Sequence, residues 1–358
     1  MVFRPYDIRG VADRDLKDEL VQKIGRGLGR MLRRGGPEGA PPRIVVGRDC
    51  RASGPRLFDA LVHGLVDGGV DVIDVGVGPT PLMYFGVRSL DADGGVMITG
   101  GHDPKEINGF KITRSSGRFV GEDLEKLEAW VAGAPPPLGI QGSLETIMVE
   151  DGYLDRLEKL ELADPGMKVV VDAGNGAAGP IALRALRGLG ITPTALNCRM
   201  DGSFPNHDPD PLVAENLAQL AGAVRAQNAR VGVAWDGDGD TLGVVDANGA
   251  IVAGERLLAL FASEVLRENP GATVIVDARC SLSKADGVVP WTTGRCPTPA
   301  DMREHDALFA GDARGHFCFR DHYLGFDDAI YAAVRLLEIL SRRGKTVGEL
   351  LVAIEAGA

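Results

Sequence analysis

The sequence predicts an α/β protein built from three tandem, similar α/β domains, each with a mixed sheet sandwiched by helices. Two observations support this fold class. Short runs of β-branched residues alternate with helical stretches, which is typical of α/β units around mostly parallel sheets. One arrangement of strands, helices and polar loops also occurs three times along the 358 residues, a length that allows two or three domains.

Each copy opens with a buried-type strand that ends near an aspartate, and each ends with a strand that follows a polar loop. The first copy is predicted to contain, in order, the strand Arg43–Asp49, the helix Pro55–Gly68, the strand Val70–Val77, the strand and loop Gly95–Pro104 and the strand Gly109–Thr113. The second is predicted to contain Lys168–Asp172, the helix Pro180–Leu189, Thr192–Asn197, Arg230–Asp240 and Thr241–Asp246.

The third copy is predicted to contain the strands Thr273–Asp277, Val288–Thr293, Ala307–His316 with its loop, and Phe317–Asp321. Ala278–Gly287 is a poor candidate for its first helix. Phe326–Leu340 is apolar at helical spacing and predicts a core helix, with Asp327 or Asp328 as its N-cap.

We expect domains over residues 1–138, 143–246 and 247–358, with a Pro/Gly-rich linker at Ala132–Gly142. Ligand sites in α/β sheets gather beyond the carboxyl ends of strands. The three copies therefore offer three equivalent loops, at Gly100–Pro104, Asp236–Asp240 and Gly311–His316, which can face one cleft if the domains pack side by side.

The composition narrows the classes of partner and location. A net charge of −11 argues against a nucleic-acid or anionic-membrane surface. No apolar run is long enough to span a bilayer, and the N-terminal residues lack a signal-peptide pattern. The five cysteines are scattered without a CxxC pair, which favours a reduced, cytoplasmic protein without a zinc or disulfide scaffold.

The loop Asp236-Gly237-Asp238-Gly239-Asp240 directly follows a predicted strand and indicates a metal site. The glycines allow a tight turn on which the three carboxylates converge. Such carboxylates repel one another without a cation, and all-oxygen ligands suit Mg²⁺, Mn²⁺ or Ca²⁺. An EF-hand is excluded because Thr241 and Ala247 stand where it needs Gly and Glu. An acidic surface turn is the simpler alternative.

A second glycine motif, Gly174–Gly179, matches the GxGxxG of dinucleotide-binding proteins. The acidic ribose ligand expected about 20 residues later, at the end of the next strand, is replaced by Asn197-Cys198-Arg199. We interpret these glycines as structural packing.

Several segments resemble the α-D-phosphohexomutases, the phosphoglucomutase/phosphomannomutase family, in the right order along nearly the whole chain. They are Phe3–Gly10, Gly47–Pro55, Thr99–Ile112, Val169–Gly179, Asp201–Leu217, Asp236–Asp240 and Gly315–Tyr331. The resemblance implies three similar α/β domains followed by a smaller fourth that clamps the substrate phosphate. It also implies a phosphoserine beside Mg²⁺, which exchanges its phosphoryl group with a hexose phosphate through a bisphosphate.

The chain departs from the family pattern at five points. Gly101 stands at the phosphoserine position, and Thr241 replaces an Arg that follows the metal loop. Gly311–His316 reads GDARGH where the family has GEMSGH, and Thr293–Pro299 lacks an expected His and Lys. The sequence stops at Ala358, where the fourth domain would begin, so we expect that domain to be absent.

The resemblance assigns roles to the residues that remain. It implies metal binding by Asp236, Asp238 and Asp240, catalytic roles for His102, Lys111, His316 and Arg9, and substrate binding by Asp312, Arg314 and Arg256. The two histidines could exchange protons near neutral pH or be local hydrogen-bond anchors. Arg314 favours a more anionic ligand than a plain hexose, because Arg prefers phosphate or carboxylate. Arg256 is equally well explained as a surface charge.

The sequence leaves three functional hypotheses open. The first is a divergent enzyme that binds Mg²⁺ and a phosphorylated sugar or polyol, with phosphatase-like chemistry in which water replaces the serine. The second is a non-catalytic sugar-phosphate binder or partner subunit. The third is a genuine phosphomannomutase/phosphoglucomutase. A homodimer that donates phosphate ligands to its partner is a further option.

Overall fold

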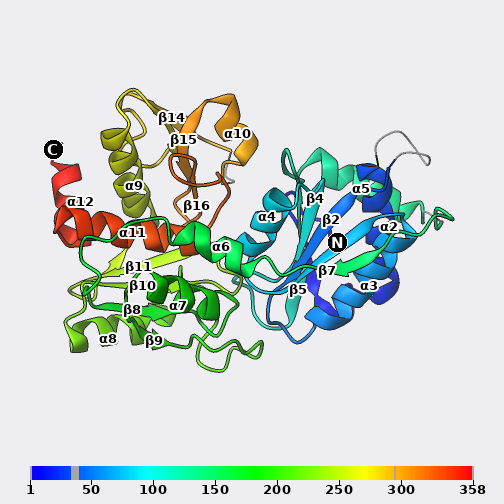
Figure 1. Cartoon of the computed structure of the whole chain (residues 1–358), viewed down its shortest axis with the longest axis horizontal. Helices are drawn as coiled ribbons and strands as arrows, with labels where there is room; N and C mark the ends of the chain where they lie inside the picture. Colours follow the sequence, from blue (N-terminus) through cyan, green and yellow to red (C-terminus); the bar gives the residue numbers. More distant parts are fainter. Residues whose placement is uncertain (1, 34–39, 135, 294–295, 357–358) are drawn as a thin grey trace. The chain divides into compact units, whose positions relative to one another are not determined.

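The computed structural model describes residues 2–33, 40–134, 136–293 and 296–356. The chain divides into two compact units. Met1–Asp151 together with Asp201–Ser203 form the first, and Gly152–Met200 together with Phe204–Ala358 form the second. One sheet lies in the first unit and two lie in the second (Figure 1).

The sheet of the first unit has the strand order β1-β5-β4-β2-β3-β7, with β6 paired to β5. Strands β4, β2, β3 and β7 are parallel to one another, whereas β5 is antiparallel to both β1 and β4. The strands are β1 (Ile8–Val11), β2 (Arg43–Arg48), β3 (Asp71–Val77), β4 (Gly94–Ile98), β5 (Ile107–Arg114), β6 (Gly117–Arg118) and β7 (Leu144–Thr146).

Alternation along β2 serves two layers of helices, because successive side chains of a strand point to opposite faces. Ile44 and Val46 join a core that includes residues of α2, α3 and α5, whereas the backbone of Gly47 lies against Met83 of α4. Figure 1 shows these helices around the sheet. They are α1 (Ala12–Asp15), α2 (Asp18–Leu32), α3 (Gly54–Asp67), α4 (Thr80–Ser89) and α5 (Glu122–Ala132).

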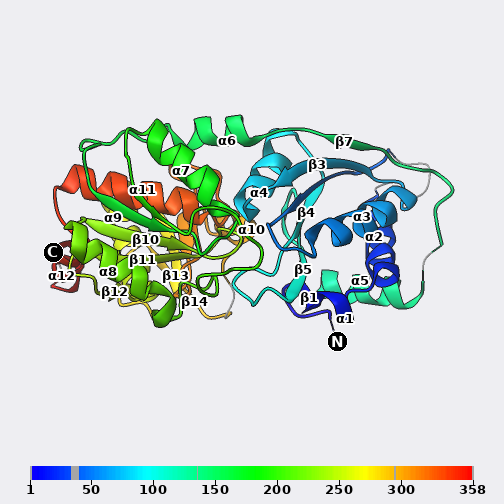
Figure 2. The same ribbon diagram turned by 90° about the horizontal axis from the view of Figure 1, so that it is seen from below.

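The second sheet has the order β12-β11-β10-β8-β9. Helix α8 packs on one face, with Leu220 and Val224 against Val170, and Figure 2 shows α11 on the other face. The elements are β8 (Val169–Asp172), β9 (Thr194–Leu196), β10 (Val231–Trp235), β11 (Leu242–Asp246), β12 (Ile251–Val252), α6 (Glu150–Leu157), α7 (Ala178–Gly188), the 3₁₀ turn η2 (Ala214–Leu217) and α8 (Ala218–Gln227).

The third sheet has the order β14-β13-β15-β16 and packs on α9 through a cluster of aromatic rings. The ring of Phe261 on α9 lies edge-on to Phe317 and Phe319 of β16. The elements are α9 (Gly254–Glu268), β13 (Thr273–Asp277), β14 (Val288–Trp291), α10 (Pro299–Glu304), β15 (Ala307–Gly311), β16 (Phe317–Phe319), α11 (Ala329–Arg343) and α12 (Val347–Glu355).

The threefold repetition expected from the sequence is confirmed by the topology. Each sheet contains the same four-strand order, β3-β2-β4-β5, β9-β8-β10-β11 and β14-β13-β15-β16, in which the last strand is antiparallel and the others are parallel. Residues 278–287 form turns and contain no helix, as the weak pattern there indicated.

Several predicted bounds need correction. Helix α11 begins at Ala329, three residues after the start of the apolar run at Phe326. The predicted N-cap is confirmed at Asp328, whose carboxylate accepts hydrogen bonds from the N–H groups of Ile330 and Tyr331. Strand β9 begins at Thr194, after Pro193, which has no N–H to donate. Strand β7 joins the first sheet although it lies beyond residue 138, the expected end of the first domain. The expected domain bounds stay predictions.

Candidate active site

The loop after β10 brings three buried carboxylates together. One carboxylate oxygen each from Asp236, Asp238 and Asp240 lies within 4.8 Å of the others, and their exposed fractions are 2% or less. Oδ1 of Asp236 accepts three backbone hydrogen bonds at 3.0–3.1 Å, from Gly239, Asp240 and Thr241. This folds the loop around Asp236, and we expect its other oxygen to meet a cation. An all-oxygen, buried donor set of this kind fits a hard divalent ion.

The GxGxxG turn packs against this loop. A side chain on Gly176 would come within 2.8 Å of the backbone of Gly237, and one on Gly179 would meet the carbonyl of Cys198 at 2.3 Å. The N–H of Ala177 donates to the carbonyl of Gly237 at 2.9 Å. A dinucleotide would need such N–H groups for its phosphates. The structure thus agrees with the packing interpretation of these glycines.

Segments around the third sheet hold the other side of the Asp loop. The indole N–H of Trp235 donates to the carbonyl of Ala329 at 2.9 Å, and the N–H of Ala329 donates to Gly239 at 3.3 Å. Leu242, directly after the loop, donates its N–H to Gly315 at 3.0 Å. The Asp loop is therefore held on both sides by hydrogen bonds within the second unit.

His316 lies beside the Asp loop. Its Nδ1 is 3.1 Å from Oδ1 of Asp312, while its Nε2 is 3.4 Å from Oγ1 of Thr241 and 3.8 Å from Oδ1 of Asp240. Burial lowers the pKa of His316, but the negative charges of Asp312, Asp240 and Asp327 outweigh it and raise the pKa above its usual value.

Asp312 serves its own loop. It is 4% exposed, and its oxygens accept hydrogen bonds from the N–H of Arg314 (3.0 Å), from the guanidinium of Arg314 (3.0 Å) and from His316. Burial acts to raise the pKa of Asp312, but His316 and Arg314 lower it below its usual range. Arg314 is half exposed, whereas Arg256 forms an exposed ion pair with Glu355 of α12 at 2.7 Å.

In the first unit, the loop after β4 contains Gly101. Its N–H donates to Oγ1 of Thr99 at 2.8 Å, and its backbone adopts a φ of +55°. This left-handed conformation favours glycine, because a side chain there clashes with the backbone. The residue at the phosphoserine position thus lacks a hydroxyl and also has a backbone suited to glycine.

Arg51 holds this loop from inside the first unit. The guanidinium is fully buried, pairs with Asp49 at 3.0 Å and donates to four backbone carbonyls, those of Gly101, Asp103, Pro104 and Ile107. A buried guanidinium that satisfies four carbonyls fixes the path of the chain between them. Arg51 was not among the predicted site residues.

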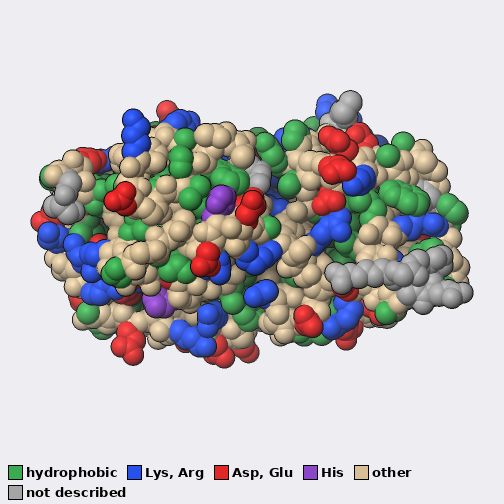
Figure 3. All heavy atoms as spheres, turned by 90° about the horizontal axis from the view of Figure 1, so that it is seen from above, with side chains coloured by type: hydrophobic (Ala, Val, Ile, Leu, Met, Phe, Trp, Pro, Cys, Tyr) green, Lys and Arg blue, Asp and Glu red, His purple; other side chains and the backbone are tan. Residues whose placement is uncertain are grey.

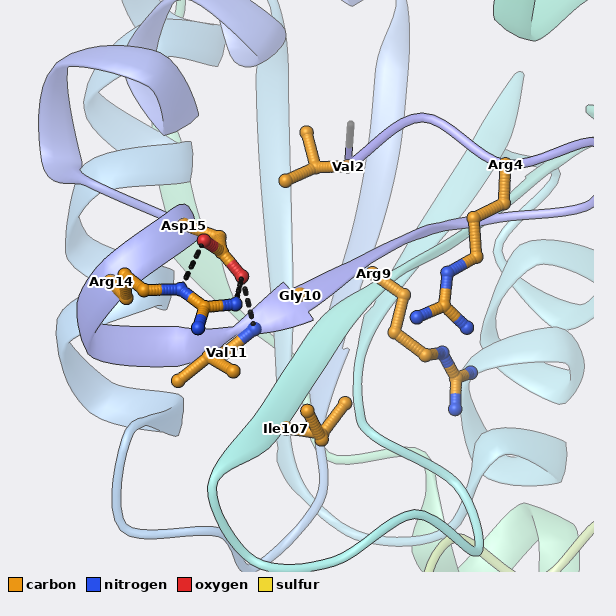
Figure 4. Close-up of a pocket in the computed structure, with 8 residues that line it drawn as sticks. All are labelled: Val2, Arg4, Arg9, Gly10, Val11, Arg14, Asp15 and Ile107. Atoms are coloured by element: carbon orange, nitrogen blue, oxygen red, sulfur yellow. Dashed lines mark hydrogen bonds and ion pairs between the residues drawn. The ribbon is translucent and has the colours of Figure 1, made fainter.

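Arg9, from β1, also reaches this loop. It donates to the carbonyl of Gly100 and pairs with Asp7 and Asp103 at 2.7 and 2.9 Å. A pocket of about 370 Å³ opens beside it, lined in part by Arg4, Arg9 and Arg14. Figure 4 shows the side chains of Arg4 and Arg9 running the same way, while Arg14 bends back onto Asp15.

The predicted site residues thus gather in two places. In the first unit, Arg9 contacts the loop that contains Gly101 through Gly100 and Asp103. In the second unit, the three aspartates of the Asp loop lie together with His316, Asp312 and Arg314. His102 is exposed and has no hydrogen bond or ion pair with a described residue, and Lys111 lies on β5 opposite Met97. Gly294 and Arg295, in the stretch expected to lack His and Lys, lie outside the described residues.

Two residues near the predicted sites were not predicted to belong to them. Asp327 offers an oxygen within 4.8 Å of ligand atoms on Asp240 and His316, and no local pattern marks it except its place before a helix. Arg51 had a usable signal, an Asp-x-Arg tripeptide at the end of a predicted strand.

The described surface carries charged side chains of both signs. Acidic and basic side chains are interspersed on the face that Figure 3 draws. Among the described residues, none of the helices combines the length and the apolar character needed to cross a membrane.

Comparison with known proteins gives one consistent family. Sequence models for phosphoglucomutase/phosphomannomutase alpha/beta/alpha domains I, II and III match residues 1–133, 151–249 and 253–356. A phosphomannomutase/phosphoglucomutase of Pseudomonas aeruginosa is 43% identical over 350 residues, which cover 95% of this chain and 74% of that protein. A phosphoglucomutase of Neisseria gonorrhoeae is 39% identical over 353 residues, covering 95% and 75%.

A solved structure agrees. A phosphoglucomutase/phosphomannomutase family protein from Burkholderia thailandensis superimposes with a TM-score of 0.89 at 40% identity, covering 98% of this chain and 78% of that one. The chain spans about three quarters of the length of these relatives. Fold, motif order and identity agree, and the chain belongs to the phosphoglucomutase/phosphomannomutase family.

Proposed function

We propose that the chain is an enzyme that binds a phosphorylated hexose together with a hard divalent cation and acts on the phosphate. The cluster of three buried aspartates after β10 carries this proposal. A bound Mg²⁺ would neutralise charge on a phosphoryl group and orient it. Asp236, Asp238 and Asp240 would hold the ion, since a buried set of carboxylates is best compensated by a cation.

The first candidate reaction is the interconversion of hexose phosphates. Relatives 41–43% identical are named phosphomannomutase/phosphoglucomutase, and these names favour the mutase over the phosphatase-like hypothesis. Because Gly101 has no hydroxyl, a mutase of this sequence needs a phosphoryl carrier other than the residue at that position.

Hydrolysis of the sugar phosphate is the second candidate, and Gly101 is the observation that favours it. With no side chain on Gly101, water can take the place of the missing serine as the nucleophile. We assign His316 the role of proton donor to the departing sugar oxygen, because it lies beside the Asp loop and the carboxylates around it raise its pKa. We assign Asp312 the task of holding His316 and Arg314, in place of direct contact with sugar hydroxyls.

The remaining site assignments stay proposals. Arg9 and Lys111 are proposed to supply positive charge near the Gly101 loop, and the exposed His102 is free to meet a ligand. Arg256 forms an exposed ion pair with Glu355, which supports the alternative that Arg256 is a surface charge. The shared cleft, the cytoplasmic location and the homodimer also stay predictions.

One incubation separates the candidates. The chain, with Mg²⁺ and a panel of hexose 1- and 6-phosphates, is followed by ³¹P NMR, which reports isomerised sugar phosphate and inorganic phosphate together. Isomerisation supports the mutase, phosphate release supports the hydrolase, and a ligand-induced thermal shift without turnover supports a binder. The variant Asp238→Asn is the control. Turnover that survives both this substitution and chelation of the metal overturns the proposed role of the cation.

A further inference from the structure

Two identical tripeptides end neighbouring strands of the third sheet. Asp277-Ala278-Arg279 ends β13, and Asp312-Ala313-Arg314 follows β15. The two strands are parallel, and their register pairs Ile275 with Ala310. Two residues further along each strand come Asp277 and Asp312, so the two turns begin side by side, about 5 Å apart.

Both turns have the same hydrogen-bond geometry. In each, the aspartate Oδ1 accepts the backbone N–H of the arginine two residues later, at 3.0 Å. Each carboxylate also binds the guanidinium of its own arginine, at 2.8–2.9 Å for Arg279 and 3.0–3.2 Å for Arg314. Each arginine is thus held by its own aspartate before any ligand arrives, which lowers the entropy cost of binding.

The buried turn of the first unit shows what such an arginine can bind. Asp49-Cys50-Arg51 has the same backbone bond at 3.0 Å and an Asp–Arg pair made through Nε alone. The nitrogens of Arg51 beyond that pair donate to the carbonyl oxygens of the Gly101 loop. In Arg279 and Arg314 both Nε and Nη2 bind the neighbouring aspartate, whereas Nη1 makes no hydrogen bond with a described residue. The two side chains are 73% and 52% exposed.

The start of α9 lies against both turns. A side chain on Gly254 would collide with the carbonyl of Ala313, and the thiol of Cys280 lies 3.8 Å from the carbonyl of Glu255. The N-terminal end of a 15-residue helix carries partial positive charge. Glu255, the second residue of this helix, carries a negative charge that attracts the guanidinium of Arg279.

We propose that Arg279 and Arg314 form an oxyanion subsite, which binds a carboxylate or phosphate on the sugar ligand besides the phosphate that meets the cation. With Nε and Nη2 held by the aspartates, the Nη1 groups of the two arginines are the donors that can reach either oxyanion. The ligand is then a doubly anionic sugar, such as a sugar-acid phosphate or a sugar bisphosphate. This inference rests on the proposed binding of a phosphorylated hexose, and it adds Arg279, which no motif of the sequence indicated.

Binding measured by calorimetry in the presence of Mg²⁺ tests the subsite. The probes are glucose 6-phosphate, 6-phosphogluconate, glucose 1,6-bisphosphate and pyrophosphate. We expect at least one of the two sugars with a second anion to bind about tenfold more tightly than glucose 6-phosphate, the worth of one charge-assisted hydrogen bond. Which of them gains identifies the second group as carboxylate or phosphate.

The variants Arg279→Gln and Arg314→Gln should each abolish that gain. Arg279→Gln should leave glucose 6-phosphate binding and thermal stability unchanged, because its side chain is exposed and holds no group of the site described above. Arg14→Gln is the matched control, since Arg14 is 74% exposed and pairs with a neighbouring aspartate in the first unit.

The outcomes separate this inference from the proposed function. If glucose 6-phosphate binds but a second anion adds nothing, or the arginine variants keep the gain, the subsite is refuted and the proposed function stands. If no sugar phosphate binds while pyrophosphate binds and loses affinity in both variants, the oxyanion site stands and the proposed function fails. If wild-type protein binds none of the four probes, both are refuted.

Discussion

Adding a side chain at Gly101 should destabilise the first unit. Its φ of +55° costs a residue with a Cβ atom about 1–2 kcal/mol. The backbone has little room to relax, because the N–H is held by Thr99 at 2.8 Å and the carbonyl by Arg51 at 2.7 Å. We therefore expect Gly101→Ala to lower the free energy of unfolding of this unit by about 1–2 kcal/mol.

The assay is urea unfolding followed by hydrogen exchange of the β4 and β5 amides, which reports on the first unit alone. Gly101→Asn is the control, because Asn tolerates the left-handed region and should lose less stability than Ala. If Ala and Asn behave alike, or if Ala leaves the unfolding free energy unchanged, the reasoning from backbone conformation is refuted. Gly101→Ser adds a functional arm, since only this variant should retain labelled phosphate from glucose 1,6-bisphosphate.

Three further predictions concern charge, loop support and the metal. Burial raises the pKa of Asp328 to about 6. Asp328 therefore keeps its proton in the folded protein between about pH 4 and 6 while it loses it in the unfolded chain. The contribution of Asp328 to stability should fall across that window by up to about 3 kcal/mol and stay level above it. Asp328→Asn should flatten this slope in urea titrations, and an unchanged slope contradicts the assignment. Arg51→Gln leaves Asp49 buried without its partner and should cost about 3–5 kcal/mol, with faster amide exchange over residues 99–107; a loss below about 1 kcal/mol argues against the support role. Gly176→Ala should weaken Mn²⁺ binding, measured by electron paramagnetic resonance, because the new methyl group meets Gly237 at 2.8 Å; Gly222→Ala, with open space around it, should bind as wild type.

The repeated core was predictable because its signal is local. Runs such as Val169–Asp172 and Thr273–Asp277 are continuous apolar strands, and both lie where the sequence indicated. Strand β7 was not predicted, since its three residues, Leu144–Thr146, are exposed and gain their structure only by pairing with β3. Such an edge strand has no periodicity of its own to detect.

The site was predictable in part for the same reason. The alternation of aspartates and glycines in Asp236–Asp240 is a local pattern, and the structure brings those carboxylates together. The contact of Asp312 with His316 and the reach of Arg51 to Ile107 depend on turns and on chain segments distant in sequence. Sequence alone could name some of these residues, but it could not show that Asp312 is committed to its own loop.

The hydrogen bonds between Ala329 and the Asp loop limit which fragments of this chain can retain the loop's structure. A fragment that ended after β12 would keep all three carboxylates of the Asp loop. It would nevertheless expose the Trp235 indole and the Gly239 carbonyl, whose partner is Ala329, and the Leu242 amide, whose partner is Gly315. Excising the middle of the chain therefore removes the contacts that hold one side of the Asp loop, and weak cation binding by such a fragment would not test the proposal for the intact protein.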